Sequence, residues 1–167
     1  VGSRYRVCEL IGSGSSSHVH RAEVLTPAAH SPSEVALKVV QLGRARSADA
    51  ISCIKRECRA LVALRGVQGV VRLLDSLTTS DGSHVIIVLE LLRGESLADV
   101  VRRYRRIEEP VAARMLAQLA NTLRICHARG LSHMDVKAEN LVFADSPCSP
   151  ASLRLIDFGV SQTTGAE

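Results

Sequence analysis

The sequence predicts an α+β fold in which short strands precede most of the helix. Two observations carry this prediction: five short runs rich in β-branched residues come early, and the longest amphipathic segment follows them. The 167 residues are 46% hydrophobic and 23% charged, which is enough apolar sequence for a globular core and the length of one ordinary domain. Only 2% are aromatic, which argues against a base-stacking or carbohydrate-binding surface.

Each predicted strand is a short apolar run bounded by loop-forming sequence. The five are Tyr5 to Ile11, Val19 to Val24, Val35 to Val40, Val70 to Asp75 and Val85 to Leu89. Two further runs, 141–143 and 153–156, adjoin polar clusters and predict a hairpin that carries functional groups at its ends.

The first helix is predicted from Ser47, as N-cap, to Leu64, just before Gly66. At 100° per residue its apolar stripe is Ile51, Ile54, Cys58, Leu61 and Leu64. Glu57 falls on this same stripe. Because burial of an unpaired charge is costly, Glu57 either lies in water at a margin or meets a cation from another element.

The second helix is predicted to begin near Pro110 and to end at Gly130. Pro110 suits the first helical position, and the acidic Glu108 and Glu109 suit the positive end of the helix dipole. The predicted apolar face is Val111, Met115, Leu116, Leu119, Leu123 and Cys126.

Charge and cysteine content narrow the function classes. The net charge is +4, and its densest part is the run Arg102, Arg103, Arg105 and Arg106. We interpret this run as a solvated helix face or loop in preference to a phosphate-binding stripe, so no nucleic-acid partner is expected. The five cysteines contain no CxxC pair, which favours a reducing compartment, and the longest strongly apolar run, 85–89, is too short to span a membrane. The absence of an initiator Met suggests a fragment.

A glycine-rich segment, Ile11-Gly12-Ser13-Gly14-Ser15-Ser16-Ser17-His18-Val19, lies between the first two predicted strands. Its glycines would let backbone amides approach phosphate oxygens, although a plain hairpin turn explains the same residues equally well. Lys38 stands in an otherwise apolar strand. Taken alone, Lys38 in such a run favours an edge strand from which the lysine reaches solvent.

The most informative stretch is 131–143 together with Asp157-Phe158-Gly159. Asp135, Lys137 and Asn140 place an acid, an ammonium and a carboxamide within six residues. Such groups can orient a hydroxyl, neutralise phosphate charge and hold a metal ion. Each could separately cap a turn, but the combination with the downstream Asp-Phe-Gly favours phosphoryl-transfer chemistry.

These motifs, in this order, resemble the first two thirds of a eukaryotic-type protein kinase domain over Tyr5 to Gly159. The resemblance implies a bilobal fold. Residues 5–91 would form an N-lobe with a five-stranded antiparallel sheet and one main helix, and residues 92–167 the first, mostly helical part of a C-lobe. It also implies ATP and Mg²⁺ as cofactors.

By the same resemblance, 11–19 covers ATP, Lys38 binds its α and β phosphates, and Glu57 pairs with Lys38. Leu89 takes the gatekeeper position, and the backbone of Glu90 to Leu92 forms the hinge that bonds adenine. Val19, Ala36 and Val142 would enclose the adenine ring.

For catalysis, the resemblance makes Asp135 the group that accepts or orients the substrate hydroxyl proton, and it makes Lys137 a contact of the transferred phosphate. Asn140 and Asp157 would be the Mg²⁺ ligands, since Mg²⁺ prefers oxygen donors. Lys137, two residues after Asp135, is typical of serine/threonine-specific members. The expected partners are therefore ATP and a Ser/Thr-containing protein, with no membrane partner, in the cytoplasm or the nucleus; the sequence does not indicate the oligomeric state.

Three positions depart from the family pattern. Met134 replaces an Arg that commonly pairs with an activation-loop phosphate, which suggests that loop phosphorylation is not the switch here. Ser17 replaces a glycine and Ala138 a proline, and neither change removes a charged catalytic group. The chain stops at Glu167, inside the expected activation segment, so we expect the isolated chain to be at best feebly active, with part of the second helix exposed.

Other functions are less well matched. An ATP-binding pseudokinase or an inactive regulatory module would not need the whole set Lys38, Glu57, Asp135, Asn140 and Asp157. A small-molecule phosphotransferase is disfavoured because the 137–140 spacing follows the protein-kinase form. His127 and His133 are expected to be structural, the second by packing beneath the Asp-Phe-Gly turn.

Overall fold

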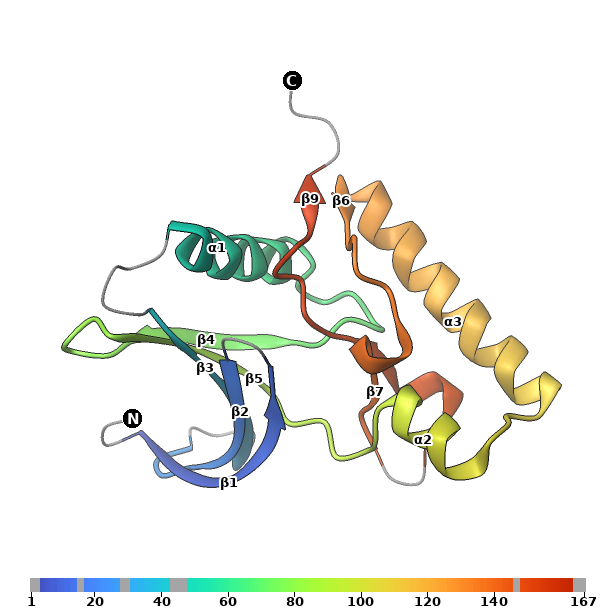
Figure 1. The fold of residues 1–167 in the computed structure, drawn as a ribbon, viewed down its shortest axis with the longest axis horizontal. Coiled ribbons are helices and arrows are strands. Elements are labelled where there is room, and N and C mark those ends of the chain that lie inside the picture. The colour runs from blue at the N-terminus through green and yellow to red at the C-terminus, as the bar shows by residue number, and fades with distance from the viewer. Residues whose placement is uncertain (1–3, 15–16, 28–30, 43–47, 146–147, 164–167) are drawn as a thin grey trace. The chain divides into compact units, whose positions relative to one another are not determined.

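The structure is a computed structural model that describes residues 4–14, 17–27, 31–42, 48–145 and 148–163 (Figure 1). The chain divides into two compact units. The first consists of Val1–Ile54 and Arg72–Leu91, and the second of Lys55–Val71 and Leu92–Glu167. These units are defined by packing, so the lobes 5–91 and 92–167 that the resemblance implies stay a prediction.

The first unit is built on a five-stranded antiparallel sheet, as predicted. Its strands are β1 (Tyr5–Ser13), β2 (Ser17–Val24), β3 (Glu34–Gln41), β4 (Leu73–Thr78) and β5 (His84–Glu90). Their order across the sheet is β1-β2-β3-β5-β4, which makes β3 the central strand. The interpretation of Lys38 as an edge-strand residue is therefore wrong.

One face of this sheet carries the core of the first unit. The core consists of the buried Tyr5, Ala22, Val35, Leu37, Ile86 and Val88, with Val24, Val39, Leu74 and Leu77 packed against it. Because side chains alternate along a strand, the odd-numbered members of β3 lie on this face. Ala36 and Lys38 consequently lie on the opposite face.

Strand β4 begins at Leu73, whereas the sequence predicted a start at Val70. The Val70 and Val71 backbone instead pairs within the second unit. Val70 forms a parallel bridge with Leu155, and the Val71 N–H donates to the Leu155 carbonyl at 3.1 Å. The run predicted from Val70 to Asp75 is therefore divided: Val70 and Val71 pair with Leu155, and the residues from Leu73 onward pair with β5.

Helix α1 (Ala48–Ala63) agrees with the prediction of 47–64, although Ser47 lies outside the described residues. Its stripe is buried at Ile54, Leu61 and Leu64, and Glu57 is buried on the same stripe with 4% of its surface exposed. Of the two alternatives for Glu57, a place in water at a margin is therefore wrong.

The second unit contains the remaining helices and four short strands (Figure 1). The helices are α2 (Leu97–Tyr104) and α3 (Glu109–Ala128), and the strands are β6 (Leu131–Ser132), β7 (Leu141–Phe143), β8 (Leu153–Leu155) and β9 (Gln162–Thr163). Short 3-10 turns occupy Ala138–Asn140 and Pro150–Ser152. Strands β7 and β8 form the predicted hairpin, and β6 pairs with β9.

Helix α3 has the predicted bounds but a narrower buried face than expected. Met115, Thr122 and Cys126 are its buried residues, whereas Leu116 is 65% exposed. The predicted face treated Leu116 as a core position. Its Cα follows that of the buried Met115 by 100°, which turns Leu116 away from the packed side of the helix.

Helix α2 was not predicted as an element. Ser96 caps its N-terminus by accepting a hydrogen bond from the Asp99 N–H at 3.1 Å. The Ser-x-x-Asp pattern was the available signal, but the segment has a single fully buried residue, Val100, and too little apolar periodicity to be recognised. Among the described residues, no helix is long and apolar enough to cross a membrane.

Candidate active site

Predicted nucleotide-binding residues of the first unit gather on the sheet face opposite the core. In the register, Val19 of β2 lies opposite Lys38 of β3, and Ala36 lies opposite Leu89 of β5. Residues opposite each other in an antiparallel pair project to the same face. The face therefore presents two small apolar side chains, a leucine and an ammonium, which suits a flat ring beside phosphates.

The glycine-rich segment forms the hairpin between β1 and β2. The Gly14 N–H donates to the Ser17 carbonyl at 2.8 Å, and the Ser13 hydroxyl lies 3.3 Å from Nδ1 of His18. Gly12 pairs with Val19 across the two strands. Ser15 and Ser16 lie outside the described residues. The two alternatives for this segment, a plain hairpin turn and a loop that covers phosphate, therefore both stay open.

The predicted hinge lies where β5 ends. Glu90 is engaged with Arg72: the Arg72 N–H donates to the Glu90 carboxylate at 2.8 Å, and the Glu90 N–H donates to the Arg72 carbonyl at 3.0 Å. The Glu90 carboxylate thus already accepts a hydrogen bond within the first unit. An adenine contact at Glu90 would therefore use backbone atoms, as the prediction requires.

The chain after Leu92 runs along β7 in the second unit. The Arg93 and Gly94 N–H groups donate to the Ala144 and Phe143 carbonyls at 2.9 and 3.0 Å. Gly94 is required here, because a Cβ would lie 2.6 Å from that of Phe143. Val142 is half-buried between the buried Leu141 and Phe143, so its side chain projects from the other face of β7.

The strongest cluster of polar groups is Asp135, Lys137 and Asn140. The Lys137 ammonium lies 2.7 Å from Oδ2 of Asp135, and the Asn140 amide donates to the same oxygen at 3.0 Å and to the Asp135 carbonyl at 2.8 Å. Asn140 is buried. Within the part of the chain that the structure describes, Oδ1 of Asp135 accepts no hydrogen bond, which leaves this oxygen for a substrate proton.

Electrostatics keep this aspartate ionised. The hydrogen bond from Lys137, followed by that from Asn140, lowers the pKa of Asp135, and desolvation opposes the effect. The same contact raises the pKa of Lys137. At neutral pH the loop therefore presents a carboxylate beside an ammonium, the charge state that proton acceptance and phosphate binding need.

His133 supports the cluster from beneath. Its Nδ1 accepts from the Asp135 N–H at 3.2 Å, and its Nε2 lies 2.9 Å from the Ile156 carbonyl. The ring meets Phe158 edge-on, with centroids 4.6 Å apart. Both rings are buried. These contacts confirm the predicted packing role of His133, whereas His127 lies exposed in the last turn of α3.

Two residues near the site adopt left-handed backbone conformations. Met134 has φ 68° and Asp157 has φ 62°. Such conformations are costly for side chains other than glycine and persist where the surrounding structure imposes them, often at functional sites. Asp157 is exposed, and its neighbours Ile156 and Phe158 are anchored through the Ile156 carbonyl and the buried Phe158 ring.

Glu57 and Lys38 belong to different units, so their pairing stays a prediction. Within the second unit, α1 contacts the Asp-Phe-Gly turn: the Arg56 Nε donates to the Gly159 carbonyl at 3.3 Å. Sequence reasoning missed Arg56. A polar residue beside Glu57 on an exposed helix face carries no local signal of a partner 103 positions away.

The predicted metal ligands, Asn140 and Asp157, supply oxygen atoms, the type of donor that Mg²⁺ prefers. Because the Asn140 amide nitrogen is used by Asp135, its oxygen is the atom left for a cation, and Asp157 offers carboxylate oxygens. In the described ranges, no three His, Cys, Asp or Glu residues group together as a preformed metal site. Two protein ligands with phosphate oxygens and water match the sparse protein coordination that Mg²⁺ commonly has.

Comparison with known proteins identifies the family. A sequence model of the protein kinase domain matches residues 5–167, so the chain belongs to the protein kinase domain family. The chain is 32% identical to a CDPK-related protein kinase of Daucus carota over 161 residues, which is 96% of this chain and 26% of that protein.

Two further relatives are plant kinases. The chain is 35% identical to CBL-interacting protein kinase 22 of Oryza sativa subsp. japonica, over 98% of this chain and 38% of that protein. It is 33% identical to CBL-interacting serine/threonine-protein kinase 13 of Arabidopsis thaliana, over 95% of this chain and 29% of that protein. The chain thus spans between about a quarter and two fifths of the length of these relatives.

Proposed function

We propose that the protein is an ATP-dependent serine/threonine protein kinase, which transfers the γ-phosphate of ATP to a Ser or Thr hydroxyl of a protein. Membership of the protein kinase domain family and the names of its relatives support this proposal. The observation that carries it is the Asp135 carboxylate, held ionised by Lys137 and Asn140 with Oδ1 left open.

The proposed reaction uses few groups. The substrate hydroxyl oxygen attacks the γ-phosphorus, the bond to the β,γ-bridging oxygen breaks, and ADP leaves. Asp135 orients the hydroxyl and takes its proton on Oδ1. The Lys137 ammonium, which contacts the Asp135 carboxylate, neutralises negative charge on the phosphoryl group as it is transferred.

Nucleotide binding is assigned to both units. In the first, Val19 and Ala36 would contact adenine, Lys38 would bind phosphate, and the 11–19 hairpin would cover it. In the second, Val142 would contact adenine, and Asn140 and Asp157 would hold Mg²⁺, which neutralises phosphate charge.

Thermal unfolding with and without Mg·ATP tests the site directly. A ligand that binds the native state raises its melting temperature by mass action. We expect a rise in the wild type that Lys38→Met and Asp157→Ala abolish and that Lys55→Met, a change at an exposed lysine of α1, retains. A folded chain with no rise would contradict nucleotide binding by this chain.

Activity then separates the kinase from an ATP-binding pseudokinase. The full-length protein should phosphorylate members of a Ser/Thr peptide library, and Asp135→Asn should abolish this while the Mg·ATP melting shift persists. Nucleotide binding without any phosphorylation would favour the pseudokinase instead.

Met134 bears on regulation. It is 58% exposed, and it stands where the family commonly has an Arg that pairs with a loop phosphate. A methionine offers no charge to a phosphate, so we propose that loop phosphorylation is not required for activity. Phosphatase treatment of the full-length enzyme should leave its rate unchanged, and a large loss would refute this proposal.

A further inference from the structure

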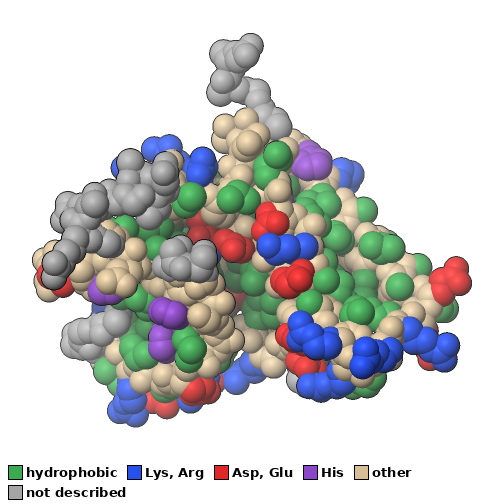
Figure 2. Space-filling view, viewed as in Figure 1, with side chains coloured by type: hydrophobic (Ala, Val, Ile, Leu, Met, Phe, Trp, Pro, Cys, Tyr) green, Lys and Arg blue, Asp and Glu red, His purple; other side chains and the backbone are tan. Residues whose placement is uncertain are grey.

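The C-terminal end of α2 presents a run of exposed side chains that the proposed catalysis does not use. All six residues from Val101 to Arg106 are exposed, with Val101 at 41% and Tyr104 at 63%. Four of the six are arginines. Figure 2 shows Lys and Arg side chains gathered at the lower right of the molecule, over α2.

Local ion pairs account for only half of this positive charge. Arg102 pairs with Asp99, and Arg103 lies 2.6 Å from the Glu95 carboxylate. Neither Arg105 nor Arg106 forms an ion pair with any residue that the structure describes. Two exposed guanidinium groups are therefore available to an outside anion.

The backbone that carries these side chains is well fixed. Ser96 caps the N-terminus of α2, and at the other end the Arg105 N–H donates to the Val101 carbonyl at 2.8 Å. Arg105 itself adopts φ 64°, the left-handed conformation of a helix C-cap. Because Tyr104 follows Val101 by three residues, these two side chains share one helix face, and Arg105 and Arg106 follow directly after the helix ends.

The composition of this exposed run is that of a protein interface. Tyrosine and arginine are the residue types that most often dominate binding energy between proteins, and an exposed valine adds apolar area. The chain has only two tyrosines, and the other, Tyr5, is buried in the sheet core. A phosphate track fits less well, because Glu108 and Glu109 follow at once and would repel a continuous polyanion.

We propose that Val101, Tyr104, Arg105 and Arg106, here called the α2 patch, dock an acidic segment of a protein partner. Asp or Glu carboxylates of that segment pair with Arg105 and Arg106, and an apolar side chain of the segment packs on Tyr104 and Val101. Guanidinium and carboxylate pair in a bidentate, charge-assisted way, which gives the contact its orientation. This inference goes beyond the proposed function, since it needs neither nucleotide nor catalytic residues.

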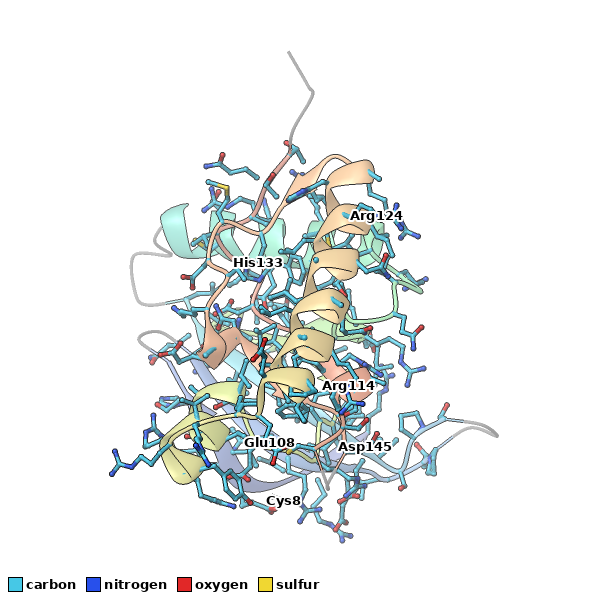
Figure 3. All side chains as sticks on the ribbon, turned by 90° about the vertical axis from the view of Figure 1, so that its right-hand side faces the viewer. Cys8, Glu108, Arg114, Arg124, His133 and Asp145 are labelled. Carbon is cyan, nitrogen blue, oxygen red and sulfur yellow. The ribbon has the colours of Figure 1, made fainter. Side chains whose placement is uncertain are left out.

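Fluorescence anisotropy of a labelled peptide of about ten residues, made of Asp, Glu and Leu, tests the proposal in the absence of nucleotide. We expect salt-sensitive binding that Arg105→Gln with Arg106→Gln weakens at least about tenfold, as loss of two charge-assisted contacts implies. Tyr104→Ala should weaken it about threefold or more. The matched control is Arg114→Gln with Arg124→Gln, at two arginines that lie along α3 in Figure 3.

Arg105→Gly separates binding from folding. Glycine adopts φ 64° without strain, so this variant should keep or raise the melting temperature while it still loses peptide affinity. Equal loss in the α3 control, or no loss in any α2 variant, would overturn the proposal. So would tighter binding of a single-stranded RNA or of phosphatidylserine vesicles than of the peptide, since either would assign the α2 patch to a different class of partner. Failure of the kinase assay would leave these binding results unaffected.

Discussion

Asn140 and Lys137 converge on the same oxygen of Asp135. The Asn140 amide donates to Oδ2 at 3.0 Å, and the Lys137 ammonium lies 2.7 Å from it. Because both partners use Oδ2, they hold the carboxylate in one orientation and leave Oδ1 unused by either of them. The loop is thus arranged before any substrate binds, which is the main requirement of a reaction that depends on positioning.

Removal of Lys137 should raise the pKa of Asp135. The hydrogen bond from Lys137 is the largest cause of the lowered pKa, so Lys137→Ala should move the protonation midpoint of Asp135 upward. The sign follows from charge: loss of an ammonium disfavours the carboxylate form. Carbon-detected NMR titration of the Asp135 carboxyl measures the change, and in the active enzyme the acid limb of the rate profile should shift the same way.

Lys137→Arg is the matched control for this experiment. It keeps a positive donor near Oδ2, so the Asp135 midpoint should stay closer to that of the wild type than in Lys137→Ala. Identical midpoints in all three proteins would show that the contact between Lys137 and Asp135 does not govern the titration.

His133 should be far more sensitive to substitution than His127. His133→Ala removes a buried ring, its edge contact with Phe158 and the partners of two backbone groups, the Asp135 N–H and the Ile156 carbonyl. We expect a loss of about 2–4 kcal/mol in the free energy of unfolding. His127→Ala, at an exposed helix position, should change it by less than about 0.5 kcal/mol. Urea unfolding measures both, and similar losses would refute the packing role.

The features that the sequence predicted correctly are those encoded by residues close together in the chain. Asp135, Lys137 and Asn140 lie within one short loop, so their types and spacing already implied a shared site. The five strands were recognisable because each is a compact apolar run. Helix α2 escaped notice because its stability depends on an N-cap and one buried valine, and neither gives a periodic pattern.

Contacts between residues far apart in the chain could not be predicted from the sequence. Nothing local indicates that Lys38 stands in the central strand, since strand order is set by pairing across the whole sheet. Arg129 likewise donates to the Ala63 and Arg65 carbonyls at the end of α1, across more than 60 residues. Leu116 was assigned to the core because periodicity reports hydrophobicity and not which packing partner is present.

Arg21 should make the sheet of the first unit sensitive to acid. Its guanidinium bonds both carboxylate oxygens of Glu9, at 2.7 and 2.9 Å, and Glu34 at 2.5 Å, and so joins β1, β2 and β3. The hydrogen bond from Arg21 lowers the pKa of Glu9. A carboxyl whose pKa is lowered by folding adds stability at neutral pH that is lost as the pH falls through its folded pKa.

Arg21→Gln should therefore lower the melting temperature at neutral pH, and the difference from wild type should shrink in acid, below the ordinary titration range of glutamate. Arg6→Gln is the control, because the Arg6 contact with Glu23 joins two strands through more exposed side chains. It should lower the melting temperature less. A difference for Arg21→Gln that is constant with pH would contradict the role of the carboxylates.

Gly69 should tolerate no side chain, for two separable reasons. Its φ is 95°, which side chains rarely adopt, and an added Cβ would overlap the Thr122 hydroxyl of α3 and lie 3.2 Å from its Cβ. Strain and overpacking together predict a loss of about 2–4 kcal/mol for Gly69→Ala. Gly66→Ala shares the positive φ, at 78°, but meets no atom within 4 Å, so it should lose only about 1 kcal/mol. Urea unfolding of the double variant Gly69→Ala with Thr122→Ala separates the two causes. If overlap is the larger cause, the double variant should lose less free energy of unfolding than the sum of the two single variants. Strict additivity would assign the whole loss to backbone strain.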